Sequence, residues 1–180
     1  MEHGLELFAR NGVANTRATD VAEAAGVAVG TLYVHFGDKC GLLREILFAG
    51  IEDLLEPLHR LAAAPPEDVA EAVRVHCTLM VDFAEARQGF CRVLFDPESV
   101  RLNVSPEILE YLVNMHERRL REGLERGIFP ADLDARVAAH AVVGMLVKVL
   151  DWWTHNPAAA SREAMIDTLT RLRVSGVYQV

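Results

Sequence analysis

Apolar residues recur at spacings of three and four along nearly the whole chain, whereas the two-residue alternation of β-strands is rare. This spacing predicts helices throughout. Leu5, Phe8 and Ala9 indicate a first helix that ends at Asn11-Gly12 and begins only about one turn before Phe8. We therefore expect an all-α fold.

Three more helices are expected before the first proline-rich break. Thr16 is expected to cap a second helix that ends near Ala24, where Gly26 then turns the chain. A third helix is expected from about Ala28 to Phe36. Asp38 follows as the cap of a longer fourth helix.

The third expected helix has two unlike sides. Thr31, Tyr33 and His35 share one side, and Leu32 and Phe36 lie on the apolar side. A small helix of this kind, preceded by a glycine turn and a second small helix, is typical of a helix-turn-helix module. In such modules the second helix enters the major groove of DNA. The pattern therefore indicates DNA binding.

Residues 62–66 contain Pro65-Pro66 and break the helical pattern, which marks a junction. Beyond it the helical spacing resumes up to the C-terminus. The expected elements are a helix over 67–87, a short segment over 90–95, a loop at Asp96-Pro97, a helix from the cap Ser105 to Gly127, an apolar helix over 137–153, and a final helix from about Ser161.

The helix expected over 137–153 is apolar on nearly all sides. Its polar side chains, His140, Lys148 and Asp151, fall with Gly144 in one narrow stripe. Such a helix has to be covered, and a second copy of the chain supplies the cover if two helices from each subunit form a four-helix bundle. The expected interface residues are Ala141, Gly144, Met145, Val149, Leu169 and Leu172.

Composition narrows the class of protein. Of the 180 residues, 51% are apolar and 24% are charged, and the mean hydropathy is +0.15, which is typical of a packed globular protein. We expect a cytoplasmic protein with no membrane segment or secretion signal. The three cysteines, Cys40, Cys77 and Cys91, form no CxxC pair, so neither a disulfide framework nor a metal site is expected.

The charge balance opposes nucleic-acid binding when it is taken alone. The net charge is −8, and residues 1–47 carry four basic and six acidic side chains. The placement of individual groups therefore has to carry the DNA-binding hypothesis.

Several segments together resemble a known family. Leu5–Gly12, Thr16, Asp20–Val27 and Gly30–Lys39 are similar in order, spacing and residue type to the N-terminal module of the TetR-type transcriptional regulators. The resemblance implies a helix-turn-helix DNA-binding domain over residues 1–40, with a shortened first helix. It also implies a helical ligand-binding and dimerisation domain over residues 41–180. A protein of this kind is expected to be a homodimer that binds a palindromic double-stranded operator as a repressor and is released by a small effector.

The resemblance assigns roles within the module. Helix-start residues and Lys39 are expected at phosphates, the beginning of the third helix at base edges, and its later aromatic and imidazole side chains at the DNA backbone. The expected DNA-binding residues are Thr16, Arg17, Ala28, Val29, Gly30, Thr31, Tyr33, His35 and Lys39. The family commonly has a polar or basic pair where this chain has Ala28-Val29. Base recognition is therefore expected to depend on apolar contacts with thymine methyl groups.

The effector is expected to be hydrophobic or aromatic. His76 and His116 lie on the apolar sides of their predicted helices, near the place where the family forms its ligand cavity. The alternative for each histidine is an ordinary core position, and core packing is likewise the alternative for each apolar candidate. The expected ligand-binding residues are His76, Met80, Phe83, Phe95, Leu112, His116 and Trp152.

Two other classes of function are alternatives to a DNA-binding regulator. The sequence has no glycine-rich phosphate loop, no nucleophile elbow and no HExxH motif, so an enzyme is not expected, nor are catalytic residues or a cofactor. The second alternative is a dimeric ligand-binding or adaptor protein of the same fold with weakened or lost DNA binding. Ala28-Val29, the short first helix and the acidic balance favour that alternative.

Overall fold

The computed structural model describes residues 1–175, and within them it contains ten helices and no strand. The predicted all-α fold is confirmed. The helices are α1 (Glu2–Asn11), α2 (Ala18–Ala24), α3 (Val29–Phe36), α4 (Lys39–Ala63), α5 (Val69–Ala86), α6 (Gln88–Leu94), α7 (Pro97–Arg101), α8 (Val104–Glu125), α9 (Ala135–His155) and α10 (Arg162–Val174). The expected second domain, 41–180, extends beyond the described part of the chain by residues 176–180.

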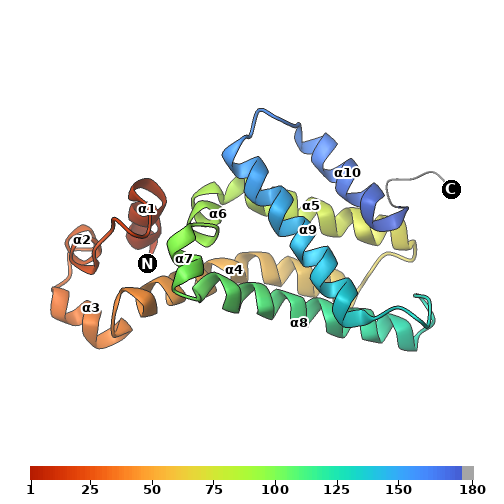
Figure 1. Cartoon of the computed structure of the whole chain (residues 1–180), viewed down its shortest axis with the longest axis horizontal. Helices are drawn as coiled ribbons and strands as arrows, with labels where there is room; N and C mark the ends of the chain where they lie inside the picture. Colours follow the sequence, from red (N-terminus) through yellow and green to blue (C-terminus); the bar gives the residue numbers. More distant parts are fainter. Residues whose placement is uncertain (176–180) are drawn as a thin grey trace.

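The helices form a small group and a larger one (Figure 1). Helices α1 to α3 lie together at one end, and the long α4 runs from them into the larger group. There α8 packs along α9 and against α4, and α5 packs along α10. Helix α6 contacts α1, α4, α5 and α9, so it lies between the small group and the rest of the protein.

Glycines end α1 and α3 and turn the chain between α2 and α3, as predicted. Gly12 and Gly37 follow α1 and α3 with φ of 83° and 75°, and Gly26 turns the chain between α2 and α3 with φ of 67°. Residues with a Cβ rarely adopt these angles. Asp38 caps α4 by accepting a hydrogen bond from Gly41 N at 2.8 Å, which is also as predicted.

Three predictions about helix starts are wrong. Thr16 does not cap α2, because its hydroxyl turns inward and donates to Gly12 O at 2.9 Å. Ser105 lies inside α8, which begins at Val104, and it donates to Leu94 O. The segment after Asp96 is the short helix α7 rather than a loop. Asp96 caps it through Glu98 N at 2.8 Å, and a proline in the first turn is a known helix-start signal.

Helix α9 is covered on one side only. Ala139, Leu146 and Leu150 are buried, whereas Ala141 and Gly144 are exposed. Within residues 1–175 it is the one helix long and apolar enough to cross a membrane, a test that the core helix of a soluble protein also passes. Its open face is the surface on which the predicted dimer contact would form.

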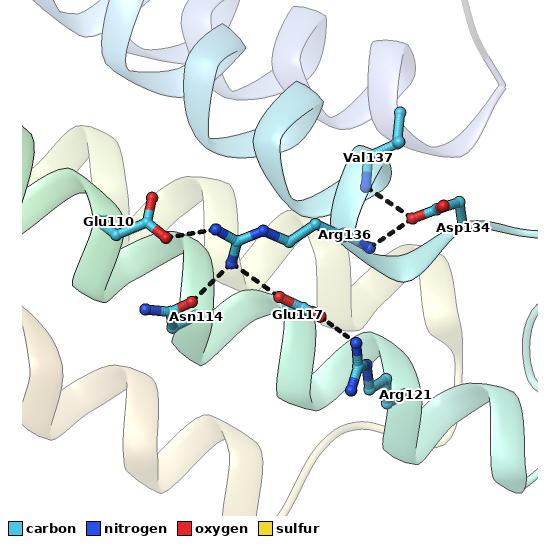
Figure 2. Close-up of polar contacts among 7 residues, drawn as sticks. All are labelled: Glu110, Asn114, Glu117, Arg121, Asp134, Arg136 and Val137. Carbon is cyan, nitrogen blue, oxygen red and sulfur yellow. Dashed lines mark hydrogen bonds and ion pairs between the residues drawn. The ribbon is translucent and has the colours of Figure 1, made fainter.

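The first turns of α9 are fixed to α8 by a polar network (Figure 2). Arg136 donates to Asn114 Oδ1 at 2.6 Å and to Glu117 Oε2 at 2.8 Å, and it also pairs with Glu110. Asp134 caps α9 by accepting from Arg136 N at 2.9 Å. A planar guanidinium shared by several acceptors holds one geometry, so this network sets how α9 leaves α8.

Candidate DNA-binding surface and effector cavity

The exposed side of α3 brings most of the predicted DNA-binding residues together. Leu32 is only 4% exposed and anchors the helix in the core. The predicted residues Ala28, Val29, Gly30, Thr31, Tyr33 and His35 are all exposed. Val34, which the sequence analysis did not single out, is the most exposed large apolar side chain of this surface, at 84%. The sequence could have predicted this exposure, because Val34 follows Tyr33 on the helix and lies away from the side that carries Leu32.

Gly30 is not required by the packing of the chain itself. A Cβ built at this position meets no heavy atom within 4 Å. Glycine inside a helix costs up to about 1 kcal/mol relative to alanine, so a glycine in open space needs another explanation. Close approach of a partner to the helix backbone is such an explanation.

Of the two DNA contacts predicted at the start of α2, Thr16 and Arg17, only Arg17 lies on the surface. Thr16 is fully buried, so its hydroxyl serves the module interior. Arg17 is exposed, and its guanidinium is held by Asp20 at 3.0 Å. Thr19, in the first turn of α2, is also exposed and was missed. A hydroxyl in the first turn of a helix was the signal for it.

Lys39 and Asp96 both form hydrogen bonds to the backbone of Val13. The Lys39 ammonium donates to Val13 O at 2.9 Å, and Asp96 Oδ2 accepts from Val13 N at 3.2 Å. The α1–α2 turn is thereby fixed to the start of α4 on one side and to α7 on the other. Sequence reasoning placed Lys39 at a phosphate and missed Asp96, because no local pattern links residues 83 positions apart.

A small cavity lies between α5, α8 and α9. Its volume is about 30 Å³, which is room for roughly two water molecules. It is lined by His76, Met80, Leu112, His116, Val143, Leu146 and Val147. Four of the seven predicted ligand-binding residues are therefore brought together. The others lie elsewhere: Phe83 stacks edge-to-face on Phe90 with ring centroids 5.4 Å apart, Phe95 is partly buried against the core, and Trp152 is 44% exposed.

The polar end of the cavity is a pair of neutral histidines. The rings of His76 and His116 meet edge-to-face with centroids 5.7 Å apart. Arg173 Nη1 lies 2.9 Å from His76 Nδ1, and since a guanidinium only donates, this nitrogen carries no proton. Burial, reinforced by the positive charge of Arg173, lowers the pKa of His76 well below its usual value and that of His116 to about 4.

The predicted dimer residues do not all share one surface. Ala141 and Gly144 are exposed on α9, and Met145 and Val149 beside them are half-buried. On α10, Leu172 is half-buried, whereas Leu169 is 1% exposed and packs in the core of its own chain. A Cβ built at Gly144 meets nothing within 4 Å, as at Gly30.

Comparison with known proteins gives this geometry a context. Residues 1–46, which contain α1 to α3 and the start of α4, match the model of the family described as bacterial regulatory proteins, tetR family. The chain is 26% identical to the fatty acid metabolism regulator protein of Bacillus subtilis over 99% of this chain and 93% of that protein. It is also 26% identical to the HTH-type transcriptional regulator AcrR of Shigella flexneri, over 87% of this chain and 77% of that one.

Solved structures share the fold over the full length. The fatty acid degradation regulator FadR of Bacillus halodurans has a TM-score of 0.84 at 22% identity and covers 99% of this chain and 94% of its own. The transcriptional regulator FadR of Bacillus subtilis, solved in complex with stearoyl-CoA, has a TM-score of 0.83 at 21% identity, with 98% and 97% covered.

The fold and the module together define a helix-turn-helix protein with a helical second domain. The match over residues 1–46 and the regulators that are similar to most of the chain agree with the predicted resemblance to the TetR-type regulators. Its relatives are transcriptional regulators and not enzymes.

Proposed function

We propose that this protein is a cytoplasmic, ligand-responsive transcriptional repressor. It binds a palindromic operator as a homodimer and is released when an effector enters the cavity between α5, α8 and α9. The observation that carries the proposal is the surface of α3, where Leu32 is buried and the residues predicted to contact DNA are exposed.

Recognition of the operator rests mainly on apolar and shape contacts. Val29 and Val34 are exposed at 37% and 84%, and their methyl groups suit thymine methyl groups in the major groove. Thr31 supplies one hydrogen-bonding group near the start of α3. Arg17 is the exposed cation of this surface, and its pairing with Asp20 orients it without removing its charge.

Dimerisation through α9 fits both the open face and the operator. Gly144 has free space around it, which permits a second helix to approach closely. A twofold contact there repeats the same residues on both sides and gives two copies of α3. Their separation on DNA is expected to be roughly 34–36 Å, one helical turn, or a longer span if the operator is longer.

The effector that we propose is an acyl-chain compound. The cavity wall is apolar apart from the two histidines, and one relative of the same fold was solved with stearoyl-CoA. A cavity of about 30 Å³ does not hold such a chain. Binding therefore requires α5, α8 and α9 to move apart, so the effector favours a conformation different from this one.

Helix α6 is suited to carry that movement to the DNA-binding module. The Phe90 ring lies against Gly50 of α4, where an added Cβ would be 2.5 Å from the ring. The same ring stacks on Phe83 of α5, and α6 also packs on α1. A shift of α5 thus displaces a tightly fitted side chain between the two domains, and rigid fits of this kind transmit small shifts.

The test is binding of the full-length protein to its own upstream DNA at several salt concentrations. Specific binding should weaken steeply with salt. Tyr33→Ala should weaken it further, because Tyr33 is 47% exposed on α3. Tyr111→Ala is the matched control, since Tyr111 is 43% exposed on α8, away from the module.

The alternative is a dimeric ligand-binding or adaptor protein without DNA binding, and its supporting observation is the acidic balance of residues 1–47. Dimerisation and effector binding with no salt-dependent DNA binding would establish this alternative. Equal effects of Tyr33→Ala and Tyr111→Ala would remove α3 from the proposed interface.

A further inference from the structure

The end of the cavity formed by His76 and His116 contains hydrogen-bonding groups that the protein itself does not use. His116 is only 8% exposed and lines the cavity. In the described part of the chain its ring nitrogens make no hydrogen bond to another residue. No fully enclosed side-chain nitrogen or oxygen in that part lacks a partner, so the His116 nitrogens are open to the cavity or to solvent.

Arg173 fixes the role of His76. Its Nη1 donates to His76 Nδ1 at 2.9 Å, and it also lies 3.6 Å from Cys77 Sγ. Because Nδ1 accepts, the proton of the neutral ring is on Nε2, which is then a donor. The two neutral imidazoles that line the cavity therefore each have an N–H group that no other described residue accepts.

The charge around this end is positive in a protein that is otherwise acidic. Most arginines in residues 1–175 pair with carboxylates, as Arg44 does with Glu107 at 2.8 Å. Arg173 and Arg119 have no carboxylate partner within the described residues: Arg119 donates to Leu58 O at 2.6 Å, and Arg173 to His76. The charge of both arginines reaches the two imidazoles. Positive charge beside buried donors favours an anion over a neutral oxygen.

From these contacts we infer that the cavity selects an acyl effector by its free carboxylate. His76 Nε2 and His116 donate to the carboxylate oxygens, and Arg173 acts as a positioning residue that holds the His76 tautomer and supplies positive charge. The hydrocarbon chain extends along Met80, Leu112 and Leu146. This inference rests on the proposed acyl effector and specifies its head group.

The test compares three probes by titration calorimetry on the full chain: dodecanoate, 1-dodecanol and dodecanoyl-CoA, each below its micellar concentration. All three carry the same chain, and they end in a free carboxylate, in a hydroxyl, or in a thioester to the large and phosphorylated coenzyme A. Dodecanoate should bind roughly tenfold tighter than the alcohol, or more, because hydrogen bonds to a charged group are the stronger ones. It should also bind more tightly than the thioester.

Single substitutions test which side chains cause the preference for dodecanoate. Arg173→Met should reduce the preference for dodecanoate over dodecanol toward one, and Arg173→Lys, which keeps the charge and a donor, should restore part of it. His116→Phe should weaken dodecanoate binding by roughly tenfold and leave dodecanol binding nearly unchanged. Arg171→Met is the control, because Arg171 is exposed on the same helix. Thermal unfolding of each variant separates lost binding from lost folding.

Equal affinity for the carboxylate, alcohol and thioester would overturn the head-group inference and leave the acyl effector standing. The same holds if Arg171→Met changes the preference as much as Arg173→Met does. Binding of none of the three probes would overturn both the inference and the acyl effector.

Discussion

The α3 surface and the cavity wall are built in opposite ways. On α3 one apolar residue, Leu32, is buried, and the polar and small residues around it face solvent. In the cavity the polar residues His76 and His116 are the buried ones, among apolar neighbours. Each region thus carries groups that do not serve the packing of the chain. This difference fits the two partners that we propose, a large polyanion outside and a small amphiphile inside.

The largest expected effect is a loss of folding stability at acidic pH, where the buried imidazole of His116 becomes protonated. The pKa of His116 is lowered from 6.5 to about 4, so between these values the unfolded chain binds more protons than the folded one. The stability contribution is complete above pH 6.5 and is lost as the pH falls toward 4. The loss from this residue should reach roughly 3 kcal/mol. Urea unfolding at pH 7 and pH 5 measures how much of this unfolding free energy is lost between the two pH values.

His116→Leu should flatten this pH dependence relative to the parent protein. His59→Leu is the control, because His59 is an exposed residue of α4. An unchanged slope in His116→Leu would mean that the imidazole is charged or solvated in the folded protein.

An intermediate effect is expected where α6 meets α4. Gly50→Ala places a Cβ 2.5 Å from the Phe90 ring, so the ring or the helix has to shift. Such overpacking should cost about 1–3 kcal/mol and alter the response of DNA binding to the effector. Gly89→Ala, also on α6, is the control for stability, since its added Cβ would meet only Ala9 Cβ, at an ordinary contact distance of 3.5 Å. Equal unfolding free energies for the two variants would contradict the tight fit at Phe90.

The smallest change in stability is expected at Gly30, where the substitution should also weaken DNA binding. Gly30→Ala should stabilise the folded protein by up to about 1 kcal/mol, since alanine favours helix and the site is open. The same change should weaken binding to the upstream DNA, because the new methyl group lies on the proposed contact surface. A variant that is more stable and binds DNA equally well would show that the backbone at Gly30 does not approach DNA.

Local patterns predicted the helices and the small module well. The glycine stops at Gly12 and Gly37 and the cap at Asp38 lie within a few residues of the pattern that predicts them. The same reasoning failed at Thr16, because whether a hydroxyl caps the next helix or bonds back to Gly12 depends on the path of the turn.

Local patterns could not predict contacts between segments that are far apart in the sequence. Spacing identified His76 and His116 as candidates, but their pairing and the link from Arg173 join α5, α8 and α10. The Asp96 contact to Val13 is of the same kind. Trp152 shows the converse error, because an aromatic residue in an apolar helix was assigned to the cavity and lies on the open side of α9.

We propose that the α3 surface and the cavity are coupled sites, and reciprocal binding measures that coupling. The affinity of the full-length protein for dodecanoate is measured with and without saturating upstream DNA, and its affinity for that DNA with and without dodecanoate. Linkage requires the two factors to be equal, and coupling of this kind is typically about 5- to 150-fold. We predict that each partner weakens the other by the same factor within that range. Tight binding of both partners with no mutual effect would contradict the proposed coupling of the two sites.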